Sequence, residues 1–80
     1  MLYLAEFYLP DANLADVARR ARAATQSAGD VSLVEVILVP ADENCFALFD
    51  AVTADAVVAA GARAGMTFDR VVEARTASAI

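Results

Sequence analysis

Three glutamates, an arginine and a tyrosine are the residues of this chain whose types and spacing could do chemistry. Glu6, Glu35 and Glu73 each stand among large apolar residues, Tyr8 follows Glu6 by two positions, and Arg75 follows Glu73 by two. A carboxylate in a partly dry pocket has a raised pKa and can serve as a base or an oxygen ligand. We therefore take these five as the candidate ligand-binding residues. The alternative is that the acids are hydrated rim charges or pair with the arginine.

Cysteine and histidine offer little further chemistry. Cys45 is the one cysteine and histidine is absent, so the chain lacks a disulfide partner and the usual ligand set of a zinc site. No imidazole can activate the thiol, and we predict that Cys45 is a small buried hydrophobic residue. The sequence also contains no glycine-rich phosphate loop and no C-x-x-C pair. We therefore assign no metal ligands and expect no cofactor.

Charge and hydropathy restrict the partners. The net charge of −5 argues against a nucleic-acid partner, because phosphates would be repelled. The apolar runs are far shorter than the roughly 20 residues that a membrane span requires. The first residues also lack the basic segment of a signal peptide. We expect no membrane contact and a cytoplasmic location, where a reducing medium suits a free thiol.

The residue pattern predicts two β-α-β halves joined by a hairpin. Strands are expected at residues 2–9, 31–39, 45–49 and 70–75, where aromatic and β-branched residues are frequent. Helices are expected at residues 14–28 and, after a cap at Thr53, up to residue 64. The order β-α-β-β-α-β indicates a ferredoxin-like α+β fold, a four-stranded antiparallel sheet with strands 1 and 3 central and two helices on one face. We take residues 1–80 as one domain.

Single residues mark the helix ends and the core. Asn13 is placed to cap the first helix, and Gly65 stands where glycine commonly ends a helix. Gly61, inside the second helix, is expected to allow close approach to the sheet or to a partner chain. Phe68 is expected to fill the core between the second helix and the last strand.

The alternation of side chains along a strand predicts what the helices leave uncovered. The uncharged sets of the first two strands belong against the helices, so the other sets face outward. That uncovered face is expected to hold Glu6 and Glu35 together with Leu2, Leu4, Tyr8, Leu33, Ile37 and Val39. Glu73 is expected to approach Glu6 there, because the first and last strands are neighbours. So many apolar side chains exceed the patch that a monomer usually exposes, and we predict a homodimer that packs two such faces together.

Three stretches carry a resemblance to a known family: Tyr3 to Pro10, Cys45 to Ala51, and Ala64 to Glu73. Through them nearly the whole chain resembles a small bacterial family of domains of unknown function, one actinobacterial branch of which is described as nickel-binding. The resemblance implies a ferredoxin-like dimer. Relatives tend to carry cysteine after the phenylalanine of the third strand and histidine near the end of the second helix. This chain has Ala47 at the first position and no histidine, and nickel favours imidazole, so we do not transfer metal binding to it.

Three functions remain open. The first is a homodimeric domain that binds a small polar ligand or a metal in an acid-lined pocket at the sheet face. The second is a cofactor-independent enzyme of the dimeric α+β barrel type, oxygenase-like or isomerase-like, with an acid as general base. The third is a purely structural or regulatory module that binds through its sheet edges. We favour the first, because the acids stand among apolar residues.

Overall fold

The element order is the predicted β-α-β-β-α-β. The computed structural model describes residues 1–26 and 29–79. Its elements are β1 (Leu2–Tyr8), α1 (Leu14–Thr25), β2 (Ser32–Val39), β3 (Asn44–Asp50), α2 (Ala54–Arg63) and β4 (Arg70–Ala74), with short 3-10 helices η1 (Pro40–Asp42) and η2 (Ala77–Ala79). The helix expected to reach Ala28 ends at Thr25, and Ala28 lies outside the described residues.

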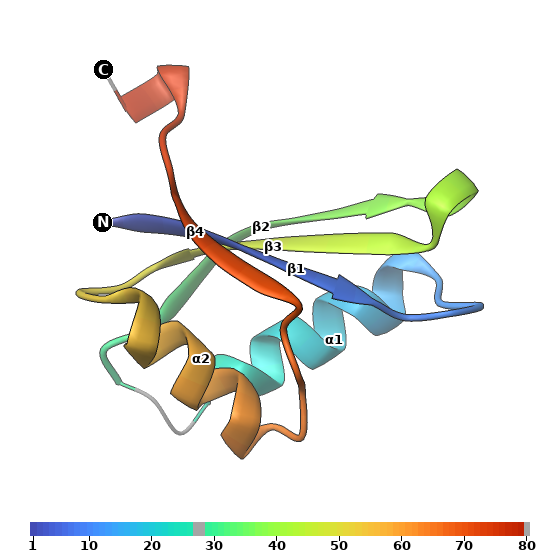
Figure 1. The fold of residues 1–80 in the computed structure, drawn as a ribbon, viewed down its shortest axis with the longest axis horizontal. Coiled ribbons are helices and arrows are strands. Elements are labelled where there is room, and N and C mark those ends of the chain that lie inside the picture. Colours follow the sequence, from blue (N-terminus) through green and yellow to red (C-terminus); the bar gives the residue numbers. More distant parts are fainter. Residues whose placement is uncertain (27–28, 80) are drawn as a thin grey trace.

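The four strands form one antiparallel sheet in the order β2-β3-β1-β4, so strands 1 and 3 are central as predicted. Both helices lie against the same side of this sheet, and the other side is left uncovered (Figure 1). The ferredoxin-like α+β fold is thereby confirmed. The segment after β4 leaves the sheet on the uncovered side, away from the helices (Figure 1).

Local side-chain bonds explain where the helices begin and end. The Asn13 side chain accepts a hydrogen bond from the Asp16 backbone N–H at 2.9 Å, and the Thr53 hydroxyl accepts one from the Ala56 N–H at 3.1 Å. Both predicted caps are therefore present, and each satisfies an N–H group that has no partner within its helix. Gly65, with φ of 75°, follows α2 in the left-handed conformation that glycine adopts without cost.

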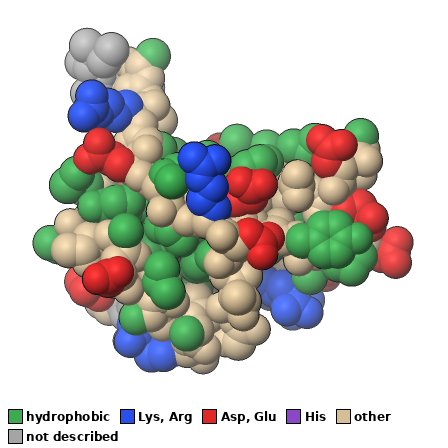
Figure 2. Space-filling model, in the orientation of Figure 1, with side chains coloured by type: hydrophobic (Ala, Val, Ile, Leu, Met, Phe, Trp, Pro, Cys, Tyr) green, Lys and Arg blue, Asp and Glu red, His purple; other side chains and the backbone are tan. Residues whose placement is uncertain are grey.

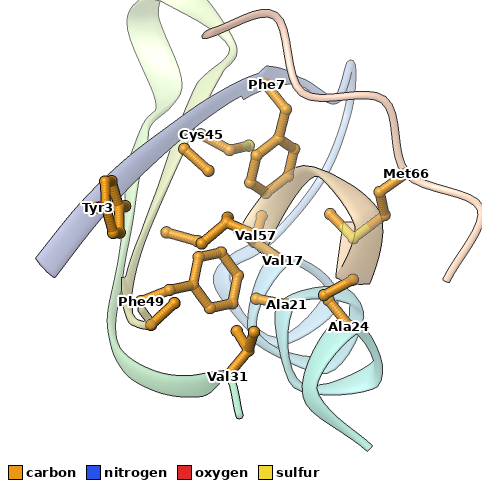
Figure 3. Close-up of a cluster of buried hydrophobic side chains, with 14 residues drawn as sticks. Tyr3, Phe7, Val17, Ala21, Ala24, Val31, Cys45, Phe49, Val57 and Met66 are labelled. Carbon is orange, nitrogen blue, oxygen red and sulfur yellow. The ribbon is translucent and has the colours of Figure 1, made fainter. Parts of the chain in front are cut away.

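The core lies between the sheet and the two helices. Phe7 and Phe49, from the two central strands, point toward Val17 of α1 and Val57 of α2 (Figure 3). Phe49, Val17 and Val57 are completely buried. Cys45 is also completely buried, as predicted, and desolvation raises the pKa of its thiol. The covered face of the sheet therefore forms the core with the helices. The other face remains available for binding.

Gly61 permits the close approach that its position in α2 predicted. A Cβ atom at Gly61 would lie 2.4 Å from Cε2 of Phe68. The Phe68 ring also packs against Phe7 and Phe49, with ring centroids 5.7 and 6.0 Å away. The aromatic side chain that follows α2 therefore fills the core only because α2 carries no side chain at this point.

A β-bulge in β2 corrects one part of the predicted sheet faces. Leu33 pairs with Phe49 and Glu35 pairs with Leu48, so one extra residue, Val34, lies between them. Leu33 consequently packs against the core side and not on the uncovered face where alternation had placed it. Val34, expected against the helices, is 53% exposed. Beyond the bulge the predicted alternation of β2 is right.

Candidate functional site: the open face of the sheet

The sheet side away from the helices, called the open face below, is the candidate site. Residues paired across neighbouring strands share a face, so the strand register fixes its composition. Its rows, read from β2 to β4, are Ser32, Asp50, Leu2 and Ala74; Glu35, Leu48, Leu4 and Val72; Ile37, Phe46, Glu6 and Arg70; and Val39, Asn44 and Tyr8.

The open face is mainly apolar. Leu4, Phe46, Leu48 and Val72 are partly exposed in its central rows, and Ile37 at its β2 edge is 51% exposed. Figure 2 shows hydrophobic side chains along the upper border of the molecule, on the side of the strands away from the helices. Acidic side chains lie between them. A contiguous apolar surface of this extent on a small domain is typical of an interaction site.

Glu6 lies in the interior of this surface. Its neighbours in the row are Phe46 on β3 and Arg70 on β4, and Leu4 and Tyr8 flank it along β1. The side chain is partly buried. None of the ion pairs formed within residues 1–26 and 29–79 engages the Glu6 carboxylate. Glu6 therefore offers a carboxylate to whatever covers the open face.

Glu35 shares the open face with Glu6 but does not adjoin it. It lies on the edge strand β2, one row away, and β3 separates the two acids. One oxygen of its carboxylate, Oε1, accepts a hydrogen bond from the Val36 backbone N–H at 2.9 Å. This bond holds the acid at the bulge and leaves the second oxygen, Oε2, for another partner.

Tyr8 lies at the end of β1 and forms a hydrogen bond that the sequence did not predict. Its hydroxyl donates a hydrogen bond to Oε1 of Glu43 at 3.2 Å, and the Asp11 backbone N–H donates to Oε2 at 2.9 Å. The Glu43 carboxylate raises the pKa of Tyr8. Glu43 and Asp11 both lie in turns and have positive φ values of 54° and 59°. The Glu43 carboxylate therefore links these two turns, and the Tyr8 hydroxyl takes part in that link and not in a ligand pocket.

Glu73 is the correction among the predicted site residues. Its register partner on β1 is Tyr3, whose side chain is buried on the core side, so Glu73 belongs to the side opposite Glu6. Arg75 forms an ion pair with Glu73 at 3.3 Å and is 89% exposed. The expected approach of Glu73 to Glu6 does not occur, and Arg70 occupies the position beside Glu6 instead.

Eight residues of the open face were absent from the sequence-based set: Phe46, Leu48, Arg70 and Val72, together with Ser32, Asn44, Asp50 and Ala74. The sequence contained a signal that could have placed Phe46 and Leu48 on the open face. They alternate along β3 with the core residues Cys45, Ala47 and Phe49. For Arg70 and Val72 such a signal was absent, because β4 is five residues long and Val71 and Val72 are equally apolar.

Concave regions and clusters elsewhere offer little chemistry. A groove of about 670 Å³ runs between α1 and β2, lined by apolar residues and Gly29 together with Arg22, Thr25, Ser32 and Glu35. Among the described residues, no three side chains of the metal-binding types come together. Glu35 is the one residue of the predicted set that borders this groove.

Among solved structures, the fold is similar to that of SCO4226 from Streptomyces coelicolor A3(2). The identity is 17%, the TM-score is 0.76, and the match covers 96% of this chain and 99% of SCO4226. At this identity the likeness shows the fold alone, which is that of a small bacterial domain. No family model matches the chain, and no curated protein does. Nickel binding receives no support from these comparisons.

None of the helices within residues 1–26 and 29–79 is long and apolar enough to cross a bilayer.

Proposed function

We propose that this chain acts as a homodimeric binding domain, in which two open faces pack together and the carboxylate of Glu6 faces a small, positively charged ligand between them. The observation that carries the proposal is the position of Glu6, an acid that forms no ion pair with the described residues and lies inside an apolar surface of the sheet. Apolar surface drives association, and a carboxylate within it supplies specificity.

The size of the open face supports a reversible dimer. Strands about 4.8 Å apart, with about 3.4 Å per residue, give a flat face of roughly 20 by 24 Å at most, because β1 and β3 have seven residues, β2 has eight and β4 has five. Side-chain relief adds to this projection, so two faces together would bury on the order of 1,000 Å². That area is near the lower limit of specific interfaces, which favours a dimer that forms and separates at micromolar concentrations.

The charges of the open face support a cationic ligand. It carries the carboxylates of Glu6, Glu35 and Asp50 against the single guanidinium of Arg70. Asp50 is bonded to the amino group of Met1 at 3.0 Å, and Glu35 is partly engaged at the bulge. A small cation with hydrogen-bond donors, such as an amine, offsets the excess negative charge that two packed faces bring together.

Two matched variants test the interface. Ile37 on the open face is 51% exposed and Val58 on α2 is 50% exposed. We expect Ile37→Glu to yield monomers in size-exclusion chromatography with light scattering, because it buries a further charge in the interface. Val58→Glu should remain dimeric. Equal behaviour of both variants and the wild type would refute the interface.

Calorimetric titration tests the ligand. Ammonium, methylammonium and L-arginine are the probes, and the proteins are wild type, Glu6→Gln and Glu73→Gln. We expect binding heat for at least one probe with wild type and with Glu73→Gln, and none with Glu6→Gln, because of these two substituted acids only Glu6 lies on the open face. Identical traces for the three proteins would exclude the Glu6 site.

A further inference from the structure

The two edges of the open face carry opposite charges. Glu35 is on the edge strand β2, and Arg70 is on the edge strand β4 at the other side of the sheet. Both side chains are exposed. Glu35 keeps one carboxylate oxygen, Oε2, outside its bond to the Val36 N–H. None of the ion pairs of the described residues engages Arg70.

Twofold symmetry allows two simple ways to stack such faces. An axis that runs along the strands, between β1 and β3, places β2 of one copy over β4 of the partner. An axis that runs across the strands places β2 over β2 and β4 over β4. The second arrangement brings Glu35 toward Glu35 of the partner subunit and Arg70 toward Arg70 of the partner subunit. Like charges then meet at both edges.

We infer that the second copy docks with its twofold axis along the strands, so that Glu35 of each copy forms an ion pair with Arg70 of the partner subunit. This inference rests on the proposed homodimer and specifies its geometry. The two residues lie in adjacent rows, and the length of an arginine side chain spans that offset. Symmetry makes the pair twice, once at each edge of the interface.

The same axis also matches the apolar centre. Leu48 on β3 and Leu4 on β1 are in one row, on the two central strands, so the rotation places Leu48 over Leu4 of the partner subunit. Aligned stacking of this kind is the common geometry of packed sheets. Apolar contact at the centre and complementary charges at the rim is the usual composition of a specific interface.

Charge reversal tests the pairing, with dimer dissociation constants from sedimentation equilibrium as the readout. We expect Glu35→Arg and Arg70→Glu each to weaken the dimer by roughly tenfold, because each places like charges at both edges. The double variant should return to within about threefold of wild type. An equimolar mixture of the two single variants should likewise form heterodimers of near wild-type strength, because each edge then carries opposite charges.

A control pair of the same charges has its acid, Glu73, on the side of the sheet opposite the open face. Glu73 and Arg75 are 3.3 Å apart within one chain, so Glu73→Arg with Arg75→Glu should leave the dissociation constant unchanged. Circular dichroism verifies that each variant is folded. Single variants as tight as wild type would overturn the axis, and a double variant as weak as the singles would overturn the pairing, with the homodimer intact in both cases. A monomeric wild type would overturn the homodimer as well.

Discussion

Glu6 lies directly opposite Arg70 across the β1 and β4 strands, and both side chains belong to the open face. In this row Glu6 has Arg70 as its neighbour on β4 and Phe46 as its neighbour on β3. Opposite charges that face each other across an antiparallel pair attract each other.

This cross-strand relation predicts a measurable coupling. We expect a double-mutant cycle of Glu6→Gln and Arg70→Gln to give about 0.2–1 kcal/mol in the free energy of unfolding, the range of opposite charges facing each other in an antiparallel pair. Urea unfolding in the Ile37→Glu background avoids a contribution from dimer dissociation. The coupling should shrink in about 1 M salt, which screens exposed charges. A cycle that gives zero at low salt would contradict the relation.

The contact of Gly61 with Phe68 predicts the effect of one methyl group. Alanine is about 1 kcal/mol better than glycine inside a helix, but overpacking a core costs about 1–3 kcal/mol. We expect Gly61→Ala to lower the free energy of unfolding, because the Phe68 ring is held by Phe7 and Phe49 and cannot yield freely. Thermal or urea unfolding measures the change.

Two further variants make this result specific. A Cβ atom at Gly29 would meet nothing within 4 Å, so Gly29→Ala should leave the free energy of unfolding unchanged or raise it. In the background of Phe68→Leu, which replaces the ring with a smaller aliphatic side chain, Gly61→Ala should cost less. An increase in stability for Gly61→Ala alone would show that the contact is not restrictive.

Tyr8 predicts a pH dependence at the alkaline end. The Glu43 carboxylate raises the pKa of Tyr8 in the folded protein above that in the unfolded chain. The contact therefore stabilises the fold at pH values below the unfolded pKa of about 10, and this contribution is lost as pH rises through the folded pKa. Phenolate absorbance of a Tyr3→Phe variant, in which Tyr8 is the remaining tyrosine, follows the titration.

The Tyr8 titration has a neighbouring charge as its control. Glu43→Gln should move the pKa of Tyr8 down toward its ordinary value, because both the charge and the acceptor carboxylate are lost. Asp42→Asn removes one acid from the same turn without removing that contact, and should move it less. Equal shifts in the two variants would mean that the pKa of Tyr8 responds to the total negative charge of the turn and not to its hydrogen bond with Glu43.

Cys45 predicts an unreactive thiol. Its side chain is completely buried, and desolvation raises its pKa, so little thiolate forms at neutral pH. We expect a disulfide reagent to modify the folded protein only at the rate of unfolding, and the urea-unfolded chain at once. The rate in the folded protein should therefore rise in variants that destabilise the core, such as Gly61→Ala. Rapid modification of the stable wild type would contradict this.

The sequence was sufficient for the architecture because local and long-range signals agree. The caps at Asn13 and Thr53 and the left-handed Gly65 mark the same helices as the apolar periodicity does. Along β1 the alternation is unambiguous, since a single charge, Glu6, marks one face and buried residues mark the other. Agreement between such signals is what lets one pattern specify one fold.

The site was less predictable because a face depends on register. The bulge at Val34 moves Leu33 to the other side of the sheet. A run of β-branched and aliphatic residues contains no sequence signal that predicts such a bulge. In β4 the two adjacent valines fit either face, so Glu73 could be assigned only once its pairing with Tyr3 was known. The contact of Tyr8 with Glu43 joins residues 35 positions apart and has no local signal.

Sedimentation equilibrium of the wild-type protein tests the central claim most directly. The open face is covered in the proposed state, and the chain has a mass of 8.4 kDa. Over a range from about 1 µM to about 1 mM, we expect the mass to rise to twice that value and no further, with a dissociation constant in the micromolar range. A mass of one chain across the whole range would contradict the homodimer and the interface site with it.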